Sequence, residues 1–133
     1  MKTKKKLKFT EVKDSGKRQL FQTGAHRDIQ DGKGRFDLLP SYALSRLARH
    51  FEAGARKYSA EKWRKGIPRA RYLDSCGRHL QELIAGMDDE DHASAVAWNI
   101  LCFIETQKAI EEGIIPKELD DLSESQKLRP KKW

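Results

Sequence analysis

Long apolar runs are missing from this 133-residue sequence, and cysteine and proline are scarce. Mean hydropathy is −0.80, and no apolar segment approaches the roughly 20 residues that span a membrane, so we expect a soluble protein without a membrane partner. The basic start of the chain is not followed by an apolar stretch, which argues against a secretory signal. The two cysteines, Cys76 and Cys102, fall in apolar helical patterns and form no CxxC pair, which favours reduced thiols in a cytoplasmic protein.

Positive charge is concentrated at one end of the sequence. The formal net charge is +7, and residues 1–36 contain 11 Lys and Arg against 4 Asp and Glu, whereas the remainder contains 16 of each sign. The excess therefore belongs to the first quarter of the chain. We predict a basic N-terminal arm over residues 1–25, a helical domain over 26–113 and a polar C-terminal tail over 114–133.

Apolar residues recur with helical spacing in three segments. The pattern predicts a first helix from Pro40 or Ser41 to about Tyr58, a second over residues 69–86, and a third from within 88–91 to about Gly113. The last polar stretch has room for one short helix, and no segment shows a confident strand pattern. The third helix is apolar almost all round, so we expect it to be central. Three helices cannot easily enclose it, which favours an all-α bundle completed by a second copy.

Two polar residues lie on the flanks of apolar helix faces. Glu52 lies on the flank of the first helix, where an ion pair with Arg56 or a metal ion would account for it. His79 lies on the flank of the second helix, either as a core-edge histidine or as a functional group. At about 100° per residue, Glu82 is predicted to point nearly opposite to the apolar face of the second helix, toward solvent.

Four consecutive acids precede the third helix: Asp88, Asp89, Glu90 and Asp91. Capping of a helix N-terminus accounts for one or two of them, but four adjacent carboxylates repel one another unless a cation is near. The surplus favours a divalent metal site for Mg²⁺ or Mn²⁺. His92 and Asn99 share a stripe two turns apart, and Asn99 is either a structural anchor or a ligand contact.

Cationic and aromatic side chains flank the first helix and complement these acids. The cations are Lys33, Arg35, Lys57, Arg64 and Lys65. Together with a metal ion they are suited to hold a polyphosphate. Tyr58 and Trp63 offer a flat surface for a base. The combination predicts a nucleotide site at one end of the helical bundle.

Five segments carry a resemblance to a known family: GKGRFDLLP (32–40), FEAGARKY (51–58), KWRKG (62–66), RYLDS…RHL (71–80) and DEDHASAVAWN (89–99). Residues 28–105 resemble the phage-type dATP/dGTP diphosphohydrolases, relatives of the MazG-like nucleoside triphosphate pyrophosphohydrolases. The resemblance implies an all-α, MazG-like bundle assembled as a dimer or tetramer. It implies Mg²⁺- or Mn²⁺-dependent hydrolysis of purine (deoxy)nucleoside triphosphates to monophosphate and pyrophosphate, by a phage or prophage protein in the host cytoplasm.

The resemblance also implies a catalytic set. Glu52 and Asp89 would be metal ligands, with His92 as a further ligand or as the base that orients water. Asp88 and Asp91 would be alternative metal ligands. The chain departs from the MazG pattern in two places, because no second acid lies three residues from Glu52, and because His92 stands where an Asp is usual.

Substrate contacts implied by the resemblance come from other positions. Lys33, Arg35 and Lys57 would hold phosphates. Asn99 would bond to ribose or phosphate, and His79 would orient a carboxylate. Trp63 would contact the base.

Two other interpretations follow from particular features. The net charge and the pI near 9.5 are typical of a small nucleic-acid-binding module, although the neutral helical region makes nucleic acid an unfavoured partner. The missing second acid near Glu52 suggests a relative that binds nucleotide without hydrolysing it.

Overall fold

The computed structural model describes residues 12–123, and the chain divides into two compact units, Met1–Leu39 and Pro40–Trp133. The start of the predicted basic arm and the end of the predicted C-terminal tail lie outside the described residues. The structure is mostly helical, which confirms the predicted all-α class.

The first unit contains a small hairpin that the sequence did not predict. Strands β1 (Arg18–Leu20) and β2 (His26–Asp28) pair antiparallel. Phe21 N–H donates to the Ala25 carbonyl at 2.9 Å, and Gly24 adopts a φ of 86° in the connecting turn. The expectation that no strand occurs is wrong here, because three-residue strands are too short for an alternating pattern to be visible. The short 3₁₀ helix η1 (Phe36–Leu38) follows the hairpin.

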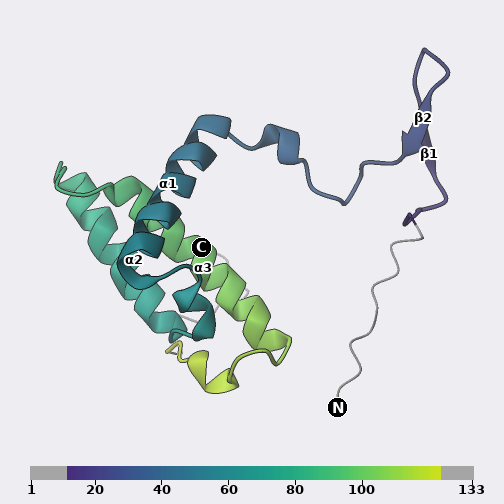
Figure 1. The fold of residues 1–133 in the computed structure, drawn as a ribbon. Coiled ribbons are helices and arrows are strands. Elements are labelled where there is room, and N and C mark those ends of the chain that lie inside the picture. Colours follow the sequence, from purple (N-terminus) through teal and green to yellow (C-terminus); the bar gives the residue numbers. More distant parts are fainter. Residues whose placement is uncertain (1–11, 124–133) are drawn as a thin grey trace, which may run out of the picture. The chain divides into compact units, whose positions relative to one another are not determined.

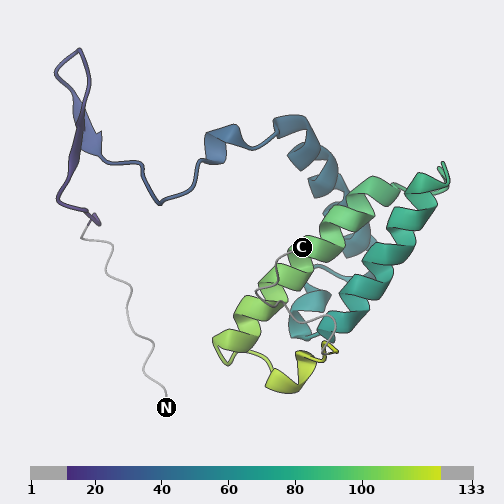
Figure 2. The same cartoon turned by 180° about the vertical axis from the view of Figure 1, so that it is seen from behind.

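The second unit is built from three helices. Helix α1 spans Ser41–Tyr58, α2 spans Arg69–Ile84 and α3 spans His92–Glu111. Two 3₁₀ turns, η2 (Lys62–Lys65) and η3 (Lys117–Leu119), precede α2 and follow α3. Helices α2 and α3 lie side by side in opposite directions, and α1 packs against α3 (Figures 1 and 2).

The helix ends agree with the sequence signals. Helix α1 begins directly after Pro40 and ends at Tyr58, as predicted. Helix α2 stops just before Gly86, whose φ of 76° suits a residue without a side chain. Helix α3 begins after Asp91, whose carboxylate accepts a hydrogen bond from Ser94 N–H at 3.1 Å. The acids before α3 therefore include one true N-cap.

Helix α3 forms the centre of the second unit, as predicted. Of the eight buried residues that the structure describes, six lie on α3. The Trp98 ring lies between two aromatic neighbours, with centroids 6.0 Å from Phe51 and 6.1 Å from Tyr72. This aromatic contact joins α1, α2 and α3.

Part of α3 nevertheless stays uncovered. Ile100, Leu101 and Ile104 on α3 are more than a third exposed, and so are Leu80 and Leu83 on α2. The expectation that three helices cannot enclose the third is confirmed. None of the helices among residues 12–123 combines the length and apolarity that a membrane crossing requires.

Candidate functional site

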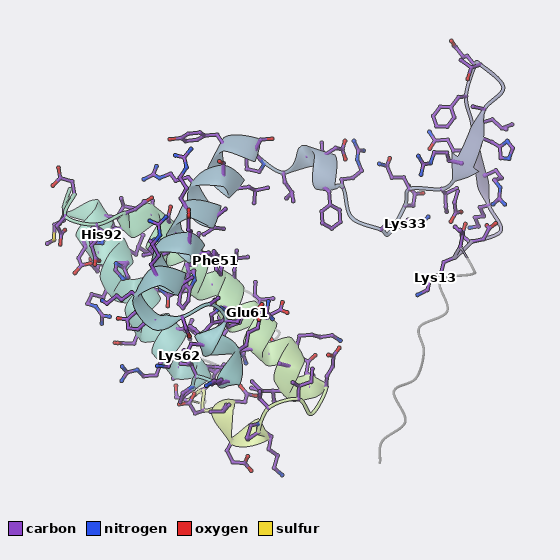
Figure 3. All side chains as sticks on the ribbon, viewed as in Figure 1. Lys13, Lys33, Phe51, Glu61, Lys62 and His92 are labelled. Atoms are coloured by element: carbon purple, nitrogen blue, oxygen red, sulfur yellow. The ribbon has the colours of Figure 1, made fainter. Side chains whose placement is uncertain are left out.

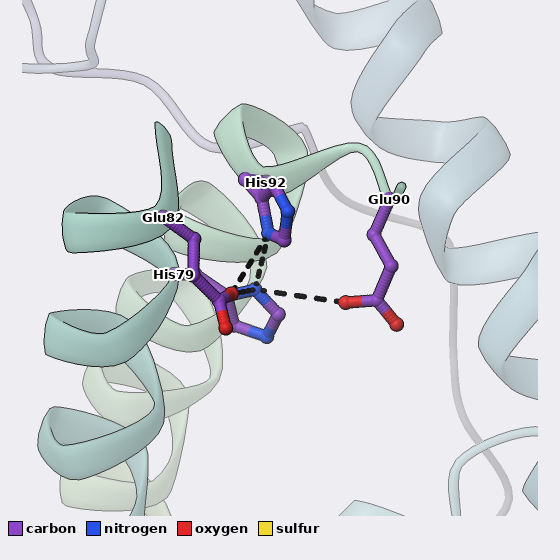
Figure 4. Close-up of side chains that lie close together, drawn as sticks. All are labelled: His79, Glu82, Glu90 and His92. Atoms are coloured by element: carbon purple, nitrogen blue, oxygen red, sulfur yellow. Dashed lines mark hydrogen bonds and ion pairs between the residues drawn. The ribbon is translucent and has the colours of Figure 1, made fainter. Parts of the chain in front are cut away.

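Four potential metal ligands meet where α2 leads into α3. His79 and Glu82 come from α2, Glu90 comes from the connecting loop, and His92 is the first residue of α3 (Figure 4). One ligand atom from each residue lies within 4.8 Å of all the others. We call these four residues the histidine–carboxylate cluster.

The distances within the cluster are short. The His92 Nδ1 atom lies 2.9 Å from His79 Nδ1 and 3.1 Å from Glu82 Oε2. The His79 Nδ1 atom lies 3.4 Å from Glu82 Oε2 and 3.8 Å from Glu90 Oε2. Two imidazole nitrogens and two carboxylate oxygens therefore converge on one point.

Helix geometry explains why these residues meet. His79 and Glu82 are three residues apart, so their side chains share one face of α2. The antiparallel connection then places the start of α3 against the last turns of α2. The expectation that Glu82 points to solvent is wrong: its side chain is 28% exposed and faces both imidazoles. The apolar face of α2 alone could not reveal this, because the loop and the start of α3 cover a second side of the helix.

Asp89 fixes the orientation of His92. The His92 Nε2 atom lies 2.9 Å from Asp89 Oδ1, and the His92 side chain is only 1% exposed. This hydrogen bond raises the pKa of His92 and lowers the pKa of Asp89. A carboxylate only accepts, so Nε2 carries the proton. The structure therefore brings together the predicted pair Asp89 and His92, with Asp89 on the far side of the imidazole from the cluster.

The neighbouring acids differ in their surroundings. The Asp91 carboxylate accepts two hydrogen bonds from Arg46, at 2.7 and 2.8 Å, besides capping α3. The Arg46 guanidinium holds the pKa of Asp91 well below its usual range. Asp88 is exposed and is not among the cluster residues. Capping thus occupies Asp91, while Glu90 faces the imidazoles.

The structure does not bring Glu52 to the cluster. Its side chain is 62% exposed, and Oε1 accepts a hydrogen bond from Arg56 at 2.8 Å. The residues of α1 that interact electrostatically with Glu90 are His50 and Lys57. At roughly 100° per residue, Glu52 lies nearly opposite them on the helix. The ion pair, one of the two explanations open from the sequence, is present, and metal ligation by Glu52 stays a prediction.

An aromatic cavity of about 470 Å³ lies beside α1, η2 and α3. Its aromatic walls are Phe51, Tyr58, Trp63 and Trp98. Charged residues also line it, namely Glu61, Lys62 and Lys65. This volume is within the range of about 300–1,000 Å³ that small-molecule sites occupy. The structure thus unites Tyr58 and Trp63, the pair expected to face a base.

The cavity and the cluster each include one residue of α3, Trp98 and His92 respectively. Trp98 follows His92 by six residues, which corresponds to about 9 Å of helix rise. Figure 3 shows His92 at the end where α2 joins α3, with Phe51, Glu61 and Lys62 further along the second unit. At about 100° per residue, the two side chains leave α3 about 120° apart, so α3 carries one residue of each feature on different sides.

Other predicted substrate contacts have local partners. The Lys57 ammonium lies 4.8 Å from the centroid of the Tyr58 ring, at the margin of the cavity. Asn99 is buried and donates to the Ala95 carbonyl at 2.8 Å and to Ser75 Oγ at 3.4 Å. Asn99 is therefore a structural anchor between α2 and α3, and its contact with ribose or phosphate stays a prediction.

Lys33 and Arg35 belong to the first unit. The Lys33 ammonium donates to Asp28 at 2.8 Å, and Arg35 pairs with Asp37 at 2.7 Å. Both cations are about half exposed, so these pairs contribute little energy, and the contact of Lys33 and Arg35 with phosphate stays a prediction.

Sequence reasoning missed three members of this site. Glu82 and Glu90 were not assigned as ligands, and Trp98 was not singled out within the apolar third helix. The i, i+3 spacing of His79 and Glu82 was the available signal, because it places an imidazole and a carboxylate on one helix face.

Convergent imidazole and carboxylate groups and an aromatic cavity are typical of small-molecule-binding domains with a metal centre. Comparison with protein families is more specific. A family model described as "dATP/dGTP diphosphohydrolase, N-terminal" matches residues 23–114, more than half of the chain. The chain therefore belongs to the dATP/dGTP diphosphohydrolase family. No curated protein and no solved structure matched it.

Proposed function

We propose that this protein hydrolyses purine deoxynucleoside triphosphates, dATP and dGTP, to the monophosphate and pyrophosphate with the aid of a divalent metal ion. The observation that carries the proposal is that one helical unit contains both the histidine–carboxylate cluster and the aromatic cavity, in a chain of this family. A nucleotide has a flat base at one end and a polyanion at the other, and these two features have the matching chemistry.

The aromatic cavity is suited to the base. Trp63 and Tyr58 provide planar surfaces on which a purine stacks, and stacking on an aromatic side chain contributes roughly 1–3 kcal/mol per base. Lys62 and Lys65, which also line the cavity, supply positive charge for the phosphates. Binding at the two ends of the nucleotide would hold the triphosphate in one orientation during the reaction.

The donor set fits a divalent cation. Glu82 and Glu90 supply carboxylate oxygens, and His79 and His92 supply imidazole nitrogens, all directed to one point. When bound, such a cation neutralises phosphate charge and lowers the pKa of a coordinated water. Asp89 would keep the His92 ring in place through its hydrogen bond to Nε2. The predicted ions Mg²⁺ and Mn²⁺ are both candidates.

The reaction replaces one P–O bond with another. The oxygen of water bonds to the α-phosphorus, the bond from that phosphorus to the α,β-bridging oxygen breaks, and pyrophosphate leaves. The protein's part is to hold the α-phosphorus beside the cluster while the base occupies the cavity. No covalent intermediate is required.

A nucleotide panel tests the proposal. The full chain is incubated with dATP, dGTP, ATP or GTP and with Mg²⁺ or Mn²⁺, and the products are separated by ion-exchange chromatography. We expect monophosphate and pyrophosphate in equal amounts. Release of diphosphate and inorganic phosphate, or no release at all, would refute the proposal, and stabilisation by nucleotide without turnover would identify a non-catalytic relative.

A matched pair of variants connects the activity to the site. Glu82→Gln removes one charge from the cluster with little change in shape. Glu118→Gln makes the same change in η3, at an exposed residue outside the cluster and the cavity. We expect only Glu82→Gln to impair hydrolysis.

We also propose that the second unit associates with another copy of this chain. The uncovered residues Ile100, Leu101 and Ile104 form the apolar surface that supports this proposal. Light scattering coupled to size-exclusion chromatography tests it, with a dimer or tetramer as the expected mass. A monomer at micromolar concentration would exclude it.

A further inference from the structure

We propose that the histidine–carboxylate cluster is a binding site for a borderline transition-metal ion of the Zn²⁺ and Co²⁺ class, which it holds without nucleotide and in preference to Mg²⁺. This inference deepens the proposed function by specifying the metal. It concerns binding, so it can be tested apart from hydrolysis.

The orientation of His92 is the first argument. Because Nε2 donates its proton to Asp89, the opposite nitrogen, Nδ1, is the one that faces the cluster. A carboxylate that holds the far side of an imidazole is the usual arrangement behind a metal-ligating histidine. The ring is almost completely buried, so it is held in this orientation by the surrounding protein.

The crowding of acceptors is the second argument. The Glu82 carboxylate and the Nδ1 atoms of His79 and His92 all approach one centre, at separations of 2.9, 3.1 and 3.4 Å. A proton on His79 Nδ1 lets that atom donate to one of its neighbours, whereas without this proton all three atoms are acceptors and repel one another. A cation at their centre turns this repulsion into coordination.

The spacing of the donor atoms is the third argument. Zinc bonds to nitrogen and oxygen at about 2.0–2.1 Å, so the edges of a tetrahedron around it are about 3.3 Å. Four of the six donor separations, from 2.9 to 3.8 Å, bracket that length, and all six are within 4.8 Å. Small side-chain rotations would bring all four donors to a tetrahedral ion.

The nitrogen donors decide the class of metal. Mg²⁺ prefers oxygen ligands and usually keeps several waters, with one or two carboxylates and substrate phosphates completing its shell. Imidazole suits Zn²⁺ and the other later first-row ions, and affinity for such sites rises from Mn²⁺ through Co²⁺ to Cu²⁺ and falls again at Zn²⁺. Two imidazoles among four donors therefore favour Co²⁺ and Zn²⁺.

Cobalt titration provides a direct readout. The full chain is freed of metal with a chelator and titrated with Co²⁺, whose visible absorption reports its coordination geometry. Calorimetry with Zn²⁺, Co²⁺ and Mg²⁺ measures the affinities in the absence of nucleotide. We expect one ion per chain, tetrahedral cobalt bands, and affinity for Co²⁺ at least about 100-fold above that for Mg²⁺.

Two variant pairs locate the bound ion. His79→Gln and Glu82→Gln each remove one ligand, and their matched controls are His26→Gln in the hairpin and Glu118→Gln in η3. Loss of an outer partner of a ligand typically costs 10–100-fold in metal affinity, so we expect losses of at least about that size for the two ligand variants and none for the controls. Circular dichroism verifies that each variant is folded.

Each outcome decides the inference. Absent cobalt bands, equal affinity for Mg²⁺ and Co²⁺, or unchanged binding by both ligand variants would overturn it. Stoichiometric Co²⁺ binding without hydrolysis of any nucleotide would retain the metal site and refute the proposed function. Hydrolysis with Mg²⁺ in a protein that binds no Co²⁺ would refute the transition-metal site and retain the proposed function.

Discussion

Two glutamates on neighbouring helices have the same side chain and very different surroundings. Glu82 on α2 is 28% exposed and lies 3.1 Å from His92 and 3.4 Å from His79. Glu52 on α1 is 62% exposed and pairs with Arg56 one turn away. Each lies on an amphipathic helix, so the helical pattern does not distinguish them. The start of α3 lies against Glu82, whereas Glu52 is open to solvent. The packing of the helices therefore decides which glutamate faces the histidines.

The largest predicted effect separates these glutamates directly. Removal of one charge-stabilising group commonly lowers kcat by about 10²–10³-fold, and we expect a loss of that size for Glu82→Gln. For Glu52→Gln we expect a loss below about fivefold, because an exposed pair of this kind contributes little. Steady-state kinetics with dATP and dGTP measure both. The reverse order would restore Glu52 as the metal ligand that the family resemblance implies.

The sequence predicted most of the fold because local signals mark the helix ends. Helix α1 begins directly after Pro40, α2 ends just before Gly86, and α3 begins directly after the four acids, as these signals predict. It also placed His92 and Asp89 in one candidate site, because they are three residues apart on the chain. It missed Glu82, whose role depends on a partner helix. The hairpin was missed because its strands have only three residues each.

The same comparison can be made with two arginines. Arg69 at the start of α2 is buried, donates to Asp120 at 2.8 Å and to Gln107 at 3.0 Å, and stacks on Phe103 at 3.9 Å. Breaking such a buried pair typically costs about 3–5 kcal/mol. We expect Arg69→Ala to lower the free energy of unfolding by about 3 kcal/mol, at the lower end because Asp120 is half exposed.

Arg56 provides the exposed control for this measurement. Its pair with Glu52 is open to solvent on both sides, so Arg56→Ala should change stability by no more than about 0.5 kcal/mol. Urea unfolding followed by circular dichroism gives both values. Equal losses would show that burial at the start of α2 does not strengthen the interaction.

Helix α1 and the 3₁₀ turn η2 are predicted to contribute to substrate binding through their aromatic side chains in the cavity. Trp63→Ala removes one wall of the cavity, and loss of base stacking of about 1–2 kcal/mol corresponds to a rise in KM of roughly 5–30-fold. The matched variant Phe36→Ala removes an exposed ring of the first unit and should leave KM unchanged. A fall in kcat with constant KM in Trp63→Ala would instead assign this ring to the reaction step.

Asp91 is a third carboxylate, and its exposure of 32% lies between those of Glu82 and Glu52. Asp91 caps α3 and pairs with Arg46, which lowers the pKa of its carboxyl. A lowered pKa stabilises the fold above the unfolded value of about 3.9, and the gain is lost as the pH falls below it. Asp91→Asn retains an oxygen for the cap and removes the charge. We expect it to cost about 1 kcal/mol at pH 7.

The pH profile isolates this charge from the rest of the protein. Wild type should lose more stability than Asp91→Asn between pH 5 and pH 3, so the two unfolding curves should converge in acid. Glu52→Gln, measured in the same way, should stay close to wild type throughout, because its ion pair is exposed. Parallel curves for wild type and Asp91→Asn would mean that the Arg46 pair does not stabilise the fold. Among the three carboxylates compared, only Glu82 in the histidine–carboxylate cluster would then differ in its effect from the exposed Glu52.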